Sequence, residues 1–196
     1  RHGKGEMTYT DGKFKGQVYE GYWKDDKKDG KGICKYGDNI IYEGDWKDDK
    51  PNGKGTCAYT NGNVYEGELK DGNKHGEGKM YYGEDYHTWD ICNVYEGEWK
   101  DDKKHGYGKF SRKNYTYEGE WKDDEKDGWG KEKFTFRENY EGEFKNGKKH
   151  GYGKYSRKNY TYEGEWKEGF EHYYGISNDS GQIQISKRFI GGGRWV

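Results

Sequence analysis

A repeat of 22 or 23 residues constrains the fold of this chain more than any other feature. The tripeptide Tyr-Glu-Gly begins at seven positions, Tyr19, Tyr42, Tyr65, Tyr95, Tyr117, Tyr140 and Tyr162. Six of these tripeptides are followed by a Gly-x-Gly motif that always begins 11 residues after the tyrosine, whereas the distance to the next tyrosine varies. A constant half and a variable half indicate one structural unit in fixed register, with joints that tolerate insertion.

Each unit is predicted to be a β-hairpin. In the words YEGEWKDDKKHGYGKF, the first and last parts are the strands and DDKKH is the turn. Because successive side chains of a strand point to opposite faces, Tyr95 and Trp99 share a face with Gly97, and Gly106 shares one with Gly108. If these faces coincide, each glycine leaves room for a ring. The predicted aromatic groove comprises Tyr95, Trp99, Tyr117, Trp121, Tyr140, Phe144, Tyr162 and Trp166.

The composition supports an all-β chain held together by aromatic side chains. Hydrophobic residues make up only 28% of the sequence and charged residues 37%, which on average favours disorder. Against this stand 21 Tyr, 8 Trp and 7 Phe, each of which can bury about 150–250 Å². The 34 Gly residues disfavour long helices. The net charge of −1 gives no broad field to attract nucleic acid, and no apolar run approaches the ~20 residues of a membrane span.

This repeated sequence motif resembles the MORN repeat (membrane occupation and recognition nexus). The resemblance covers about residues 1–175 and recurs seven times. It implies an all-β fold in which stacked hairpins form an elongated, single-layer antiparallel sheet with an aromatic groove. The array is expected to occupy residues 1–175, with a partial first repeat and a degenerate last one, because Tyr173 replaces the first glycine there. Residues 176–196 are expected to form a capping strand and a flexible tail.

Nothing in the repeat predicts catalysis or metal binding. Five histidines occupy one repeat position, His2, His75, His105, His150 and His172, but equivalent positions lie about 10 Å apart, too far to share a zinc ion. They are interpreted as structural turn residues. The same spacing prevents a disulfide between Cys34 and Cys57. With Cys92 the count is odd, which favours reduced thiols and a cytoplasmic protein. We expect no enzymatic activity and no cofactor.

Two departures from the repeat give candidate partner-binding residues. The first is the long joint before Tyr95, which contains His87 and Trp89. A plain loop is the alternative interpretation. The second is the residue between the two glycines of Gly-x-Gly, which is Lys or Glu in the N-terminal repeats and aromatic in the later ones, at Tyr107, Trp129, Tyr152 and Tyr174. Strand alternation places this column opposite the groove, either as a binding stripe or as simple cover for the second face.

Three functional hypotheses remain at the sequence level. The first is a protein-interaction scaffold that binds a helix, a filament component or a second copy of itself, since Tyr and Trp dominate binding hot spots. Resemblance to Lys-, Asn- and Tyr-rich arrays of ciliary and cytoskeletal proteins, including radial-spoke heads, favours that setting. The second is a membrane-apposed, phosphoinositide-contacting module, for which the near-zero charge predicts weak binding. The third is an accessory array of a larger enzyme such as a lipid kinase.

Overall fold

The computed structural model describes residues 1–37, 39–83, 93–135 and 138–186. Its strands fall into two compact units, residues 1–103 and 104–196, and the prediction of an all-β antiparallel fold is confirmed. The first unit holds β1 (Gly3–Thr8), β2 (Gln17–Lys24), β3 (Lys27–Tyr36), β4 (Asn39–Lys47), β5 (Lys50–Ala58), β6 (Val64–Lys70), β7 (Asn73–Tyr82), β8 (Asn93–Lys100) and the short 3₁₀ turn η1 (Gly12–Phe14).

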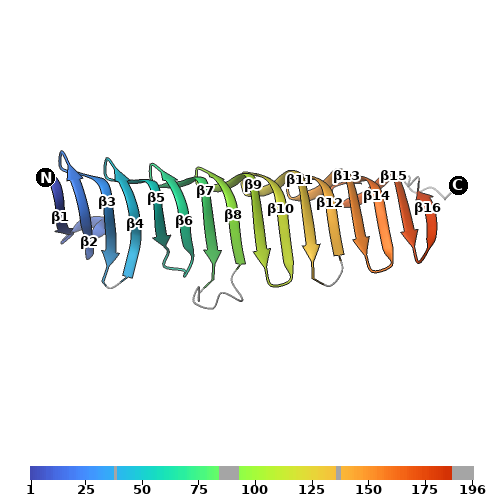
Figure 1. Ribbon diagram of the computed structural model, residues 1–196, viewed down its shortest axis with the longest axis horizontal. Coiled ribbons are helices and arrows are strands. Elements are labelled where there is room, and N and C mark those ends of the chain that lie inside the picture. Colours follow the sequence, from blue (N-terminus) through green and yellow to red (C-terminus); the bar gives the residue numbers. More distant parts are fainter. Residues whose placement is uncertain (38, 84–92, 136–137, 187–196) are drawn as a thin grey trace. The chain divides into compact units, whose positions relative to one another are not determined.

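The second unit repeats the same architecture. It holds β9 (Lys103–Arg112), β10 (Tyr115–Lys122), β11 (Glu125–Phe134), β12 (Glu138–Lys145), β13 (Lys148–Arg157), β14 (Tyr160–Lys167), β15 (Phe170–Asp179) and β16 (Gln182–Ser186). Within each unit every strand pairs antiparallel with its neighbours in the sequence, so each unit is an open sheet of linked hairpins (Figure 1). The expected boundary at residue 175 falls inside β15, which continues to Asp179.

The hairpin turns are shorter than the five-residue turn predicted from the sequence. Only two residues turn, and the Lys-Lys-His segment predicted as turn belongs to the second strand, as in β9. Both turn residues have positive φ, for example 49° at Asp123 and 72° at Asp124. Two left-handed residues match the type I′ turn, whose twist suits a hairpin, and Asp tolerates this conformation better than most residues. Four of the five histidines predicted as turn residues therefore lie in strands, His75, His105, His150 and His172, whereas His2 precedes β1.

The two glycines of Gly-x-Gly serve different purposes. The first has positive φ, 107° at Gly128, and lies next to the register shift that the hairpin makes between Gly119 and Trp121. It is a backbone requirement of the bulge. The second leaves space for a ring, because a Cβ at Gly130 would lie 2.5 Å from the Tyr117 hydroxyl. The sequence argument assigned the ring space to both glycines, and it holds for the second.

The core of each unit consists of aromatic rings on one face of the sheet, which we call the inner face. The stack of rings is unbroken in the second unit, whereas Leu69 interrupts it in the first. Tyr117 is fully buried, and its hydroxyl donates a hydrogen bond to the Glu120 carbonyl at 2.9 Å. Its ring meets Trp121 of the same repeat and Phe144 of the next edge-on, at centroid distances of 5.0 and 5.2 Å. Because each tyrosine touches two repeats, the stack joins neighbouring hairpins as well as closing each one.

Candidate protein-interaction face

The predicted groove aromatics line a closed core. All eight are buried, and none is more than 6% exposed: Tyr95, Trp99, Tyr117, Trp121, Tyr140, Phe144, Tyr162 and Trp166. The indole N–H of Trp121 donates to the Gly108 carbonyl of the neighbouring strand at 3.0 Å, so even the polar edge of this ring is satisfied inside the sheet. A partner could reach these rings only by displacing the packing that holds the repeats together.

Lysine side chains complete this core, a feature that the sequence argument missed. The Lys28 side chain is buried, and its ammonium lies 4.9 Å from the ring centre of Tyr19 and 4.5 Å from that of Trp46 in the next repeat. Cations at such distances are attracted to the faces of aromatic rings. The same position, nine residues after the tyrosine of Tyr-Glu-Gly, carries a ring-contacting lysine in four other repeats, at Lys74, Lys104, Lys126 and Lys149. Burial lowers the pKa of Lys104 and of Lys149.

Two repeats depart from this lysine position. The third repeat has Pro51 there, and the next repeat, which would supply the covering aromatic ring, has Leu69 instead. The last repeat has Glu171, whose carboxylate accepts a hydrogen bond from the Tyr160 hydroxyl at 2.8 Å. A lysine is thus present where a following repeat supplies a ring to cover it, which marks the position as a joint between repeats. The recurring lysine is visible in the sequence, but its role depends on a contact between neighbouring repeats.

The opposite, outer face of the second unit presents three of the four predicted partner-binding aromatics. Tyr107 is 55% exposed, Trp129 45% and Tyr152 51%, and we call these three residues the aromatic row. They lie on β9, β11 and β13, every second strand, and hence about 10 Å apart. Tyr174 lies in β15, but its side chain is outside the described set, as are His87 and Trp89 in the joint before β8. The partner-binding role of Tyr174, His87 and Trp89 stays a prediction.

Hydrogen bonds tie two rings of the aromatic row to the neighbouring strands. The hydroxyls of Tyr107 and Tyr152 each donate to a glutamate on the following strand, Glu118 and Glu163, at 3.2 Å. Desolvation is the largest cause of the raised pKa of both tyrosines, and the interaction with the glutamate adds to it. Glutamates beside the row fold back onto the sheet instead of standing between the rings. Glu120 accepts from the backbone N–H of Trp129 at 2.7 Å. Two of the three rings are therefore tied to the sheet through their hydroxyl groups.

A row of charges of alternating sign runs beside the aromatic row. The row takes one exposed charged residue from each strand from β9 to β14, in the order Lys109, Glu118, Lys131, Glu141, Lys154 and Glu163. Each is the direct partner of the next across the sheet, and we call these six residues the charge row. Its ion pairs include Lys131–Glu141 at 2.9 Å and Lys154–Glu163 at 3.3 Å. Exposed pairs of this kind contribute little to stability, so their order matters more than their strength.

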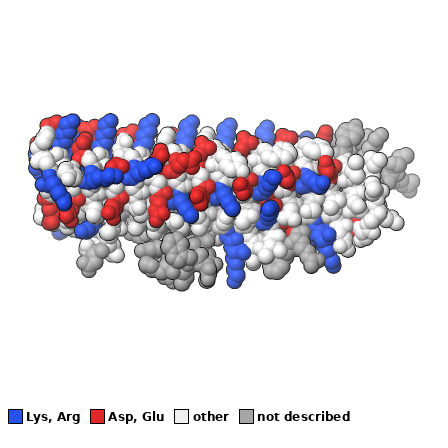
Figure 2. All heavy atoms as spheres, in the orientation of Figure 1, with Lys and Arg blue, Asp and Glu red and all other residues white. Residues whose placement is uncertain are grey.

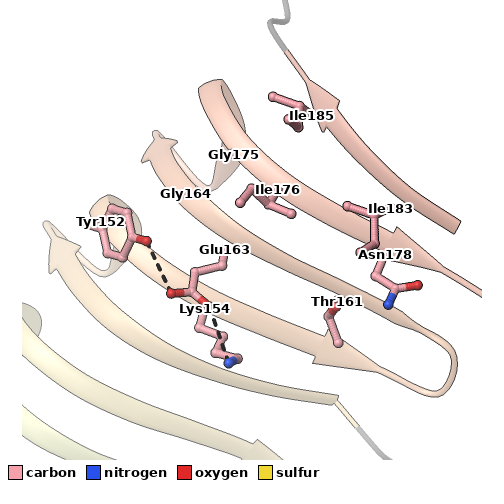
Figure 3. Close-up of a pocket in the computed structure, with 10 residues that line it drawn as sticks. All are labelled: Tyr152, Lys154, Thr161, Glu163, Gly164, Gly175, Ile176, Asn178, Ile183 and Ile185. Carbon is pink, nitrogen blue, oxygen red and sulfur yellow. Dashed lines mark hydrogen bonds and ion pairs between the residues drawn. The ribbon is translucent and has the colours of Figure 1, made fainter. Parts of the chain in front are cut away.

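An apolar hollow lies at the C-terminal end of the outer face (Figure 3). Its volume is about 580 Å³, and its walls include Tyr152, Thr161 and three exposed isoleucines, Ile176, Ile183 and Ile185. Figure 3 shows Tyr152 and Lys154 both turned towards the Glu163 carboxylate. The expected C-terminal strand is present as β16, but its isoleucines are exposed, whereas a capping element usually presents a polar surface.

The outer face of the first unit has the same fold as that of the second unit but carries different charges. Lys31 and Lys54 occupy the positions that are aromatic in the second unit. Lys31 pairs with Asp45 at 2.7 Å, and Lys35 with Glu20 at 3.6 Å. Figure 2 likewise shows basic and acidic side chains interleaved on the face that it displays. Paired lysines leave no cluster of unbalanced positive charge of the kind that anionic lipid requires.

The described residues offer little for catalysis. They contain no group of three or more His, Cys, Asp or Glu that could hold a metal ion. Cys34 and Cys57 are free thiols, and burial raises the pKa of Cys57 to about 11, so that it is not a nucleophile near neutral pH. The Nδ1 atoms of His105 and His150 are buried without a hydrogen-bond partner within the described residues. No helix in that part of the chain is long and apolar enough to span a membrane.

Comparison with known families agrees with this architecture. The model of the MORN repeat matches eight segments, residues 1–14, 19–40, 42–64, 65–84, 95–116, 117–135, 140–161 and 162–175. These segments cover most of the chain, and their limits follow the hairpins. Repeats of this family form non-catalytic modules that take part in protein or membrane interactions. No curated protein sequence matches the chain. The matched segments, the stacked hairpins and the ring-on-glycine core together show that the chain belongs to the MORN-repeat family.

Proposed function

We propose that the chain is a non-enzymatic scaffold that binds protein through the aromatic row on the outer face of its second unit. The observation that carries the proposal is the exposure of Tyr107, Trp129 and Tyr152, at 45 to 55%, on the outer face beside the charge row. Soluble proteins seldom leave aligned aromatic rings exposed without a use, and Tyr and Trp are enriched in binding hot spots.

The inner face is the competing location for binding, and its burial argues against it. The rings there are already packed against glycines and lysines of neighbouring repeats. On the outer face, in contrast, Tyr107 and Tyr152 are hydrogen-bonded to Glu118 and Glu163, which lowers the entropic cost of making a contact. We therefore assign cohesion between repeats to the inner face and partner binding to the outer face.

Partner capture tests the proposal. The wild-type chain is compared with the variant Tyr107→Lys/Trp129→Lys/Tyr152→Lys, which imitates the lysines of the first unit. A control carries Lys31→Ala and Lys54→Ala at equivalent positions of the first unit. We expect the wild type and the control to retain the same partner proteins and the triple variant to lose them, with near-equal melting temperatures. Retention of the same partners by a folded triple variant would refute the proposal.

The setting that we propose is a ciliary or cytoskeletal assembly, such as a radial-spoke-like complex. The support is the resemblance of the Lys-, Asn- and Tyr-rich repeats to arrays of such proteins. A tagged copy in ciliated cells should remain with the axoneme after detergent extraction. Its release into the detergent-soluble fraction would argue against this setting. A phosphoinositide-contacting role is the alternative, and vesicle sedimentation should show no more binding to phosphoinositide vesicles than to neutral ones.

A further inference from the structure

The outer face of the second unit is complementary to itself, and we propose that its partner is a second copy of this chain. In the proposed dimer, the two outer faces meet about a two-fold axis that is parallel to the strands and lies between β11 and β12. The proposal rests on the function proposed above, because it names the partner of the same aromatic row. Two independent rows of side chains fit this single operation.

The charge row gives the first argument. The operation reverses the order of the strands, so that β9 lies opposite β14, β10 opposite β13 and β11 opposite β12. Since odd-numbered strands carry lysine and even-numbered strands carry glutamate, every charge meets its opposite. Lys109 faces Glu163 of the second copy, Glu118 faces Lys154, and Lys131 faces Glu141. An axis at right angles to the strands would instead place lysine on lysine and glutamate on glutamate.

The aromatic row gives the second argument. Its rings stand on odd-numbered strands, and the reversed copy places its own rings over even-numbered strands. The strands that carry the aromatic residues of the two copies then alternate along the row, each about 4.8 Å from the next. Aromatic pairs prefer centroid distances of about 4.5–7 Å, so rings carried at this strand spacing are close enough to contact one another. Glu120 leaves its gap open, because its carboxylate is held against the backbone of Trp129.

The chemistry of the two rows favours a second copy over a lipid surface or a nucleic acid. The charge row contains three lysines and three glutamates and has no net charge. It therefore does not attract a uniformly anionic partner, but its alternating charges are complementary to those of an identical row in reversed order. In such interfaces the rings supply most of the affinity, and the charges set orientation and register.

Charge exchange between chains tests this arrangement. Lys154 and Glu118 lie on β13 and β10, so they are not neighbours within one chain, but the dimer places each against the other. A chain with Lys154→Glu should dimerise at least about tenfold more weakly than the wild type, which corresponds to ~1.4 kcal/mol. The same is expected of Glu118→Lys. An equimolar mixture of the two variants should regain wild-type affinity, because every contact in the mixed dimer again joins opposite charges.

Sedimentation equilibrium of the full chain over a range of concentrations gives the readout, and circular dichroism checks the fold. Lys54→Glu is the control, because Lys54 is an exposed lysine on β5 of the first unit, outside the charge row, and dimerisation of this variant should be unchanged. The variant Tyr107→Lys/Trp129→Lys/Tyr152→Lys should be monomeric and provides a second test if a charge variant does not fold. A monomeric wild type overturns the proposal, and so does a dimer that is insensitive to both the charge and the aromatic changes. Either result leaves partner capture to decide the proposed function separately.

Discussion

At the scale of the residue, the fold depends on close contact between rings and glycines. The ring of Tyr117 lies against Gly119 and Gly130, and a Cβ at either position would overlap its hydroxyl or the facing backbone. The ring cannot move away, because its hydroxyl is bonded to the Glu120 carbonyl and its edges meet Trp121 and Phe144. A single methyl group at this contact must therefore displace the core.

Gly130→Ala should lower the free energy of unfolding by about 1–3 kcal/mol, the usual cost of overpacking a well-filled core. Lys133→Ala is the control, because Lys133 is exposed on the same strand and should cost less than about 0.5 kcal/mol. Chemical denaturation followed by tryptophan fluorescence measures both. Equal stability of Gly130→Ala and the wild type would mean that the ring does not lie on this glycine.

At the scale of the element, neighbouring hairpins are joined by contacts that cross from one repeat to the next. The lysine nine residues after each tyrosine lies beneath an aromatic ring of the following repeat, and its backbone N–H is often bound by the following turn. Lys28 N–H donates to Asp49 and Lys104 N–H to Asp124, at 2.9 and 3.0 Å. In the third repeat, Pro51 has no N–H to donate, and the following turn has Gly72 in place of aspartate.

Restoring this joint should be cooperative. Leu69→Trp would supply the missing ring, and Pro51→Lys would supply the missing ammonium. In a double-mutant cycle of unfolding free energies, we expect the two changes together to be about 0.5–2 kcal/mol more stable than the sum of the single changes. Denaturation of the four chains measures the coupling. Strict additivity would mean that the lysine and the ring do not act as one joint.

Much of the hairpin could be predicted from the sequence, because every repeat has the same pattern of residues. The fixed distance from Tyr-Glu-Gly to Gly-x-Gly set the register, and strand alternation separated Tyr117 from Trp129. What the sequence argument missed depends on backbone geometry or on contacts between repeats. The left-handed Asp123–Asp124 turn and the buried lysines are examples. A lysine in a charged sequence looks solvated until the ring that covers it is known.

At the scale of the whole molecule, tyrosines of the core link stability to alkaline pH. Burial, with smaller contributions from Tyr9 and nearby acidic groups, raises the pKa of Tyr19 from 10.0 to about 12. Burial is also the largest cause of the raised pKa of Tyr42, Tyr65, Tyr117, Tyr140 and Tyr162. Each of these phenols must stay neutral in its core, whereas it ionises near pH 10 in the unfolded chain.

The sign of the pH effect follows directly. A group whose pKa is higher in the folded state holds its proton longer there, so its contribution to stability is complete below pH 10 and is lost as the pH rises towards 12. We expect the melting temperature to be nearly constant up to about pH 10, as far as these tyrosines determine it, and to fall steeply above it. Phenolate absorbance should rise together with the loss of structure. Tyrosines that ionised at pH 10 in a still-folded chain would contradict the closed core.

The two-faced arrangement of aromatic residues is tested most directly by hydroxyl-radical footprinting, read by mass spectrometry residue by residue. In dilute, folded protein we predict rapid oxidation of Tyr107, Trp129 and Tyr152 and strong protection of Tyr117, Trp121 and Tyr140. The exposed fractions in the structure, at least 45% for the first set and at most 6% for the second, require that contrast. At high protein concentration the aromatic row should become protected as the second copy covers it. Equal oxidation of the two sets, or protection of the row and oxidation of the inner rings in dilute solution, would contradict the assignment of cohesion to one face and recognition to the other.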